Sequence, residues 1–215
     1  MKILAIGAHL DDIETACGGL IGDAVEKSHL VKMVIMSDSS YTKYDGTIER
    51  TREEAYREGI AAAHILGVKD IEILDFPTKD VPYDSSSIEA LDERVSKFKP
   101  DLILTHWPHD THQSHKRTAL ATISACRYFN NILSYEPLMP SGRSYQGFRE
   151  QLYFSVSKKG LKKKMEALRA HKSQYKKYGE KIWIGVVMAR GIYRGYEIGV
   201  SYAECFEVMR WQLIL

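Results

Sequence analysis

Four short apolar runs, separated by stretches with helical spacing, constrain the fold of this chain most. They span residues 2–7 (KILAIG), 31–37, 71–76 and 101–106 (DLILTH), and are rich in Ile, Leu and Val with little alternation. Uninterrupted apolar runs of this length are typical of parallel strands that are covered on both faces. We therefore predict a Rossmann-like, doubly wound, mostly parallel sheet in three α/β/α layers.

The segments between these runs have apolar residues at helical spacing. We expect helices over residues 18–29, 47–68 and 86–98, with Gly67 near the end of the second and serines that cap the third. After residue 130 we expect an ordered loop over 134–148, a strand over 151–157, a helix over 159–175 and a strand over 202–213. A length of 215 residues, without an internal repeat or a composition boundary, predicts a single domain, 1–215.

Charge and cysteine content exclude several classes of function. The formal net charge of +2 leaves no footprint for a polyanion, so nucleic acid is not an expected partner. The basic run 158–164 is interpreted as a solvated helix face. Cys17, Cys126 and Cys205 are far apart and lack CxxC spacing, which argues against a disulfide framework or a cysteine zinc cluster. With no signal peptide and no apolar run near the ~20 residues of a membrane helix, we expect a cytoplasmic protein without membrane insertion.

The first strand runs directly into a histidine and two aspartates, His9, Asp11 and Asp12. Ligands of such sheets bind outside the carboxyl ends of the strands. If a helical turn begins here, His9 and Asp12 share one face, and imidazole nitrogen and carboxylate oxygen both suit zinc. Asp11 would point elsewhere, within reach of a proton on metal-activated water. The alternative is that one aspartate caps the next helix and His9 is incidental.

The fourth strand runs into half of the eight histidines of the protein, His106, His109, His112 and His115, each three residues from the next. Four such histidines make poor core residues because all their nitrogens need partners. A catalytic zinc site has three protein ligands and an open position, which His9, Asp12 and one histidine of this run would supply. The residues alone do not say which histidine binds. The absence of GxGxxG argues against a metal-free nucleotide-binding protein.

These two stretches, AHLDD with GG at 18–19 and WPHDTHQSHKR, resemble the signatures of the PIG-L/LmbE family of zinc-dependent N-acetylglucosaminyl deacetylases. GTIERTREEA (46–55), HKSQ (171–174) and YAECF (202–206) are similar to further family signatures, in the same order. The resemblance implies an LmbE-like fold, a small-molecule N-acetyl sugar or conjugate as substrate, and a homo-oligomer, a trimer or hexamer.

The resemblance also implies a role for each matching residue. His9, Asp12 and His115 would bind Zn²⁺, and Asp11 would act first as general base and then as general acid. His112 would stabilise the oxyanion or the departing amine, and Arg52 would contact sugar hydroxyls.

Two residues depart from the family pattern. Leu10 replaces a proline, and Ser114 replaces an aspartate that hydrogen-bonds a histidine, a part that Asp110 is a candidate to take over. Three alternatives remain at this point: removal of a formyl or other acyl group, a non-catalytic metal- or sugar-binding protein, and Co²⁺, Ni²⁺ or Fe²⁺ in place of zinc. The loop 134–148 and a set of aromatic residues either shape the aglycone side of the site or pack in the core. These aromatic residues are Tyr175, Tyr178, Trp183, Tyr193 and Tyr196.

Overall fold

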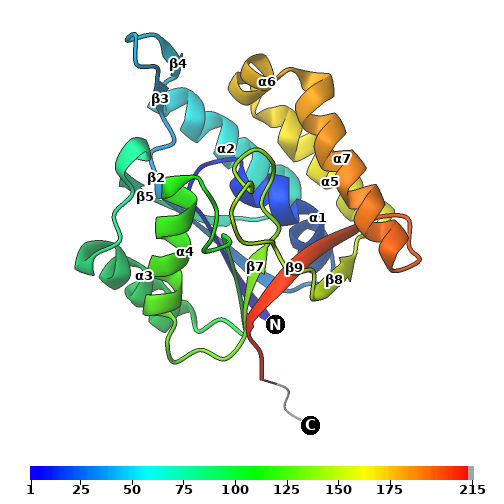
Figure 1. Cartoon of the computed structure of the whole chain (residues 1–215). Helices are drawn as coiled ribbons and strands as arrows, with labels where there is room; N and C mark the ends of the chain where they lie inside the picture. Colours follow the sequence, from blue (N-terminus) through cyan, green and yellow to red (C-terminus); the bar gives the residue numbers. More distant parts are fainter. Residues whose placement is uncertain (213–215) are drawn as a thin grey trace.

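A seven-stranded sheet forms the centre of the molecule (Figure 1), whose computed structural model describes residues 1–212. The strand order is β5-β2-β1-β6-β7-β9-β8, and the five strands from β5 to β7 are parallel. β9 is antiparallel to both of its neighbours. The strands are β1 (Lys2–Gly7), β2 (Leu30–Ser37), β5 (Asp70–Phe76), β6 (Leu102–Thr105), β7 (Ile132–Tyr135), β8 (Leu152–Ser155) and β9 (Ala203–Arg210).

Helices cover both faces of this sheet. On one face α3 packs against α4, and on the other α1, α2 and α5 pack together, each layer with its own apolar cluster against the strands (Figure 1). The three-layer, mostly parallel α/β fold predicted from the sequence is therefore confirmed. The helices are α1 (Asp12–Glu26), α2 (Arg52–Leu66), α3 (Ser85–Phe98), α4 (Gln113–Ala125), α5 (Lys158–Ala170), α6 (Lys172–Tyr178) and α7 (Glu180–Glu197), with a 3₁₀ turn η1 (Thr78–Asp80).

Two predicted helices have different bounds in the structure. The helix expected over 47–68 begins only at Arg52, because Thr51 caps it through a capping box with Glu54. The residues before it form β4 (Ile48–Arg50), which pairs with β3 (Tyr41–Thr42). The helix expected over 159–175 is interrupted at His171, whose buried ring contacts other polar side chains instead of continuing the helix.

Other predicted bounds also differ from the structure, and two helices were not predicted. α1 begins six residues before the expected start, at Asp12, while α4 and α7 were not foreseen. Ser134 and Tyr135, expected in a loop, belong to β7. The expected strand 202–213 ends at Arg210, and its last residue lies outside the described residues.

A buried ion pair ties α5 and β9 to α1. The Lys164 ammonium donates to Glu204 over 2.6 Å, and the same carboxylate accepts the backbone N–H groups of Gly19 and Leu20. α1 has a non-helical residue at Cys17, so the N–H groups just after this kink need an acceptor, which Glu204 supplies. The interpretation of 158–164 as a solvated face is therefore wrong at Lys164, which is buried.

The strand order places the two polar clusters side by side. β1 lies between β2 and β6. The strands β2 and β5 are added on one side of β1, and β6 and the later strands on the other, so the end of β1 is a topological switch point of the sheet. Ala5 pairs with Leu104, and three residues further on the Ala8 N–H donates to Nε2 of His106 over 3.0 Å. No helix within residues 1–212 combines the length and apolarity that crossing a membrane requires.

Candidate active site

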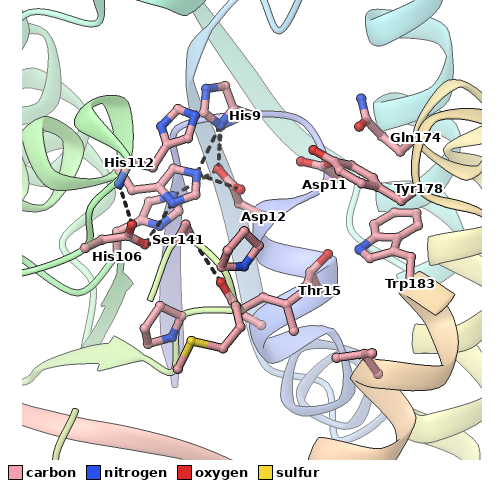
Figure 2. Close-up of a pocket in the computed structure, with 18 of the residues that line it drawn as sticks. His9, Asp11, Asp12, Thr15, His106, His112, Ser141, Gln174, Tyr178 and Trp183 are labelled. Carbon is pink, nitrogen blue, oxygen red and sulfur yellow. Dashed lines mark hydrogen bonds and ion pairs between the residues drawn. The ribbon is translucent and has the colours of Figure 1, made fainter. Parts of the chain in front are cut away.

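A cavity of about 740 Å³ opens at the carboxyl ends of β1 and β6. Residues after β1, β2, β6 and β7 line it, together with residues of β3, β4, α6 and α7. Figure 2 shows His9, His106 and His112 on one side of the cavity and Tyr178 and Trp183 on the other. The two polar clusters predicted from the sequence therefore meet in a single cavity.

His9, Asp12 and His115 form a triangle of potential ligand atoms. His9 Nδ1 lies 3.3 Å from Asp12 Oδ2, His115 Nε2 lies 3.3 Å from Asp12 Oδ1, and the two ring nitrogens lie 3.3 Å apart. Two atoms at the usual bond length of about 2.0–2.1 Å from a tetrahedral zinc ion are about 3.3 Å apart. The two histidines approach different oxygens of Asp12, so the three side chains converge on one region at separations close to those of zinc ligands.

A carboxylate behind His115 orients its ring. Nδ1 of His115 lies 2.9 Å from Oδ2 of the buried Asp110, so this nitrogen carries a hydrogen and Nε2 faces His9 and Asp12. Burial opposes a charge on the ring, but Asp12 and Asp110 outweigh it and raise the pKa of His115 to about 10. The site thus attracts one positive charge, which a proton or a divalent cation can supply.

His106 also faces this cluster. Two groups of potential ligand atoms lie close together in the described residues: Asp12 with His106 and His115, and His9 with His112 and His115. Its Nε2 lies 3.0 Å from the Ala8 N–H and 3.0 Å from Asp12 Oδ2. The nitrogen either accepts from the backbone or donates to the carboxylate, and in both cases its lone pair is not available to a metal. Burial and the nearby His115 lower the pKa of His106 to about 4, so the ring is neutral. We interpret His106 as a support for Asp12.

Asp12 turns back toward the strand instead of capping a helix. Its Oδ2 accepts the backbone N–H of His9 over 2.6 Å. Burial opposes ionisation, but His115, His106 and His9 outweigh it and hold the pKa of Asp12 well below its usual range. The alternative in which an aspartate side chain caps α1 is not observed, since Asp11 occupies the cap position without a side-chain hydrogen bond to the helix.

Asp11 lines the cavity with a strained backbone. Its φ of 148° lies in a region that residues other than glycine rarely adopt. The backbone of the preceding residue is held on both sides, because the Leu10 N–H donates to Ser39 Oγ and the Leu10 carbonyl accepts from Arg50 Nη1. Burial, and the neighbouring Asp12, raise the pKa of Asp11. An aspartate with a raised pKa beside a metal site is suited to accepting and returning a proton.

A buried polar network lies behind Asp11. Arg50 Nη2 contacts Glu58 and Nδ1 of His171, both at 3.2 Å, and His171 Nε2 lies 3.3 Å from Glu14. Glu58 also accepts the backbone N–H and hydroxyl of Ser173. Arg50 and His171 lie in segments that resemble family signatures, but the sequence analysis predicted no role for them or for Glu14. The signal available in the sequence was that Glu14 and Glu58 stand at helical spacing from apolar residues of α1 and α2.

Arg52, predicted to contact the sugar, is not among the residues that line the cavity. It is the first residue of α2, its side chain is 52% exposed, and it pairs with Asp75 on the surface. Arg50, two residues earlier in β4, does line the cavity. The short β4 strand points successive side chains to opposite sides, and the helix that follows turns Arg52 outward. The position of Arg52 therefore does not support its predicted contact.

His112 lines the cavity beside His115, with the two rings stacked at a centroid distance of 4.3 Å. Desolvation and the nearby His115 and His9 lower the pKa of His112 to about 4. Ser114 does not face His112, because its hydroxyl donates to the Thr78 carbonyl over 2.9 Å. Asp110 does bond a histidine ring, but the ring is that of His115 and not that of His112. Its carboxylate accepts the backbone N–H of His112 and binds the ring of His115.

The remaining candidates divide between the cavity and other parts of the molecule. His109 packs edge-on against Trp107 and is not among the lining residues. Of the five aromatic residues singled out in the sequence, Tyr178 and Trp183 line the cavity. Tyr175 packs in an apolar cluster with α5 and α7, whereas Tyr193 and Tyr196 are exposed outside the cavity. Some of these aromatic residues therefore line the site and one packs in the core, so each alternative holds for part of the set.

Comparison with known proteins bears on the family. The profile of PIG-L, described as GlcNAc-PI de-N-acetylase, matches residues 4–126. A diacetylchitobiose deacetylase from Thermococcus kodakarensis is 27% identical over 220 residues, which cover 94% of this chain and 81% of that protein. The uncharacterized deacetylase YaiS of Escherichia coli is 32% identical over 177 residues, which cover 80% of this chain and 90% of that protein.

The fold is shared with a solved structure. The N,N′-diacetylchitobiose deacetylase from Pyrococcus horikoshii, in complex with its inhibitor MPG, superposes with a TM-score of 0.82 over 97% of this chain and 84% of that one. At 22% identity this likeness concerns the fold and not the reaction. The family profile covers more than half of the described chain, including both polar clusters, and a relative above 30% identity covers most of it. This protein therefore belongs to the PIG-L family, as its motifs predicted.

Proposed function

We propose that this protein is a zinc-dependent hydrolase that removes the acetyl group from the nitrogen of an N-acetylated amino sugar. The observation that supports the proposal is the convergence of His9, Asp12 and His115, whose nearest side-chain nitrogen and oxygen atoms lie 3.3 Å apart, with Asp11 in the same cavity. Two imidazoles and a carboxylate are a donor set that zinc prefers, and the carboxylate behind His115 supports it.

A zinc ion bound by these three residues would act as a Lewis acid and lower the pKa of water to about 7. Asp11 takes a proton from the attacking water while the oxygen of that water bonds to the acetyl carbonyl carbon. His112 donates a hydrogen bond to the oxyanion that develops on the acetyl group. Asp11 then returns the proton to the sugar nitrogen as the C–N bond breaks, since an amine leaves poorly as an anion. The products are acetate and the free amino sugar.

The substrate class rests on the relatives. The relatives at 27% and 32% identity are both named deacetylases, and the first is named for diacetylchitobiose. A hydrolase acting on a formyl or other N-acyl group would use the same catalytic residues in the same roles and would differ only in the pocket that binds the acyl group. A non-catalytic metal-binding protein has less support, because it would have no use for a buried carboxylate on a strained backbone at Asp11.

A screen of the zinc-loaded protein against N-acetylated sugars and their conjugates tests the proposal. Free amine and acetate should appear in equal amounts, and N-formyl analogues of the best substrate should release formate more slowly. Binding of these sugars with no release of acetate or formate would instead favour the non-catalytic protein. A faster release of formate would reassign the acyl group.

A further inference from the structure

Helix α1 is interrupted shortly after it begins. Cys17 has non-helical backbone angles, with φ −132° and ψ 23°. In a regular α-helix the N–H of Gly19 would donate to the carbonyl of Thr15, and the N–H of Leu20 to the carbonyl of Ala16. Both of these bonds would span the break at Cys17. Four backbone groups in a largely buried segment therefore need other partners.

Charged side chains from three other elements supply these partners. Nη2 of Arg190, on α7, donates to the Thr15 carbonyl over 3.2 Å, and Nζ of Lys164, on α5, donates to the Ala16 carbonyl over 3.3 Å. The carboxylate of Glu204, on β9, accepts the two N–H groups that follow the break, over 2.8 Å and 2.7 Å. Each carbonyl thus meets a cation and each N–H an anion, so all four groups have charge-assisted hydrogen bonds.

The break does not serve the stability of α1 itself. An unbroken helix would satisfy the same four groups without help, whereas here three charged side chains are taken largely out of water. Lys164 is 1% exposed and Glu204 is 4% exposed, and the side chain of Arg190 is 16% exposed. A local departure from regular structure that the surroundings hold so firmly points to a functional requirement at that place.

The two parts of α1 that the break separates have different tasks. The part after it packs so closely against α5 that a Cβ on Gly160 would lie 2.8 Å from the carbonyl oxygen of Gly19. The turn before it carries Asp12 and follows Asp11, and both aspartates and Thr15 line the cavity (Figure 2). The break lets this turn take its own direction, so the aspartates face the cavity while the rest of α1 stays against α5.

Arg190 connects this turn to another wall of the cavity. Its second terminal nitrogen, Nη1, donates to the carbonyl of Glu136 over 3.2 Å, and Glu136 also lines the cavity. One guanidinium therefore joins the turn after β1 to the loop after β7. Arg190 is not itself among the described residues that line the cavity, so it acts on a bound substrate only through the segments that it holds.

We propose that Arg190 is a positioning residue of the active site. By holding the Thr15 carbonyl at the break, it fixes the turn that presents Asp11 and Asp12 to the reacting groups. This inference rests on the proposed deacetylation, because that reaction gives the two aspartates their roles. A misplacement of about 1 Å can cost about 10²-fold in rate, so loss of this contact should act on the chemical step and not on sugar binding.

The kinetic test compares zinc-loaded Arg190→Met, Arg190→Gln and Arg194→Met on the best N-acetyl sugar of the screen. Arg194 is the matched control, because it lies one turn further along α7 and binds the Glu136 carboxylate, but has no hydrogen bond to α1 among the described residues. We expect Arg190→Met to lower kcat by about 10–100-fold, with KM changed by less than about twofold. Arg190→Gln, which keeps a donor, should lower kcat less, and Arg194→Met should leave it within about twofold.

Hydrogen exchange of the backbone amides gives a readout that needs neither zinc nor substrate. The amides of residues 12–16 should exchange faster in both Arg190 variants than in Arg194→Met, and those of residues 18–26 should exchange alike in all three. Competition with a chelator on the same samples should show weaker zinc binding in the Arg190 variants, since Asp12 belongs to the turn that is released. Arg190→Gln carries the test if Arg190→Met does not fold.

An unchanged kcat in the folded Arg190 variants, a change in KM alone, or an equal loss in Arg194→Met would overturn the inference while acetate release upheld deacetylation. Hydrogen exchange decides if the native protein releases no acetate. Faster exchange confined to residues 12–16 in the Arg190 variants would then sustain the role of Arg190 in holding the turn and refute the reaction. Unchanged exchange without acetate release would refute both.

Discussion

The backbone N–H of Leu10 donates a hydrogen bond to the hydroxyl of Ser39 over 2.9 Å, and both residues are buried. Leu10 stands where the family pattern has a proline, which lacks this N–H. The leucine side chain fills the space over Gly59, where a Cβ would overlap it. The replacement therefore adds a donor beside the strained Asp11, and Ser39 satisfies it.

Ser39→Ala should lower the free energy of unfolding by about 1–3 kcal/mol, because it leaves the buried Leu10 N–H without a partner. In a Leu10→Pro background the same change should cost less, since proline has no N–H to satisfy. Urea unfolding of the four proteins in this double-mutant cycle measures the coupling. Ser40→Ala, whose hydroxyl binds Asp38 and not Leu10, should show no coupling. Equal costs of Ser39→Ala in both backgrounds would contradict the assignment.

Asp12→Ala and His115→Ala should each lose zinc, whereas Asp11→Asn should keep it and lose activity by about 10²–10⁴-fold. In the proposed mechanism Asp12 and His115 are two of the three zinc ligands, and Asp11 supplies only proton transfer. Elemental analysis of the purified variants, with acetate release measured on the same samples, separates the two effects. His109→Ala, outside the cavity, is the control for loss of a histidine. Full zinc occupancy in Asp12→Ala would refute the ligand set.

Asp110→Asn should weaken zinc binding by about 10–100-fold without removing it. The carboxylate of Asp110 fixes the ring of His115 so that Nε2 faces the other two ligands, and an amide is a weaker acceptor that can also turn its NH₂ toward the ring. Competition with a chelator of known affinity measures the change. Asp80→Asn, at an exposed carboxylate that pairs with Arg117, should leave the affinity unchanged. An unaltered affinity in Asp110→Asn would show that the ring is oriented by other contacts.

Ser114→Asp, which restores the family aspartate, should destabilise this protein and not improve it. The Ser114 side chain is buried and donates to the Thr78 carbonyl, so a carboxylate there would face another acceptor. We expect a loss of at least about 1–3 kcal/mol in unfolding free energy, more than the ~1 kcal/mol of Ser114→Ala. Thermal and urea unfolding measure both. A stable Ser114→Asp protein with faster turnover would mean that this side chain reaches His112 after all.

The buried pair of Lys164 and Glu204 predicts a loss of stability at alkaline pH. Burial disfavours the ammonium, but Glu204 outweighs it and raises the pKa of Lys164 above its ordinary value of 10.5. A raised pKa means that this stabilisation is complete below pH 10.5 and is lost as the pH rises through the higher folded value. Lys164→Met should cost about 3–5 kcal/mol at neutral pH, because it leaves the buried Glu204 carboxylate unpaired.

Urea unfolding of the native protein and Lys164→Met, from pH 8 upward, tests this dependence. Tyrosines and cysteines titrate in both proteins, so the difference between the two curves isolates Lys164. That difference should shrink as the pH rises above 10.5. A difference that stays constant over this range would contradict a charged Lys164 in the folded state.

A structural feature could be predicted from the sequence when residues close to one another in the chain determine it, and not when distant residues do. The strands at 2–7 and 101–106 could be predicted because their apolar runs are local, and parallel strands bring their carboxyl ends to one edge. The start of α2 after Thr51 was missed, because the apolar spacing extends back into β4 and only the capping box marks the boundary. The break at His171 could not be foreseen, since its partners Glu14 and Arg50 are more than 100 residues away.

The sequence by itself determined the fold class, the two polar clusters and the residue types for a metal, because strand patterning and donor chemistry are properties of short segments. Only the tertiary structure decided which side chains meet. It joined Asp110 to His115 and turned Ser114 to Thr78, and it brought Arg50 and not Arg52 to the cavity. The physical reason is that each step along a helix rotates the side chain by about 100°, so one residue of difference in where α2 or α4 begins redirects every contact.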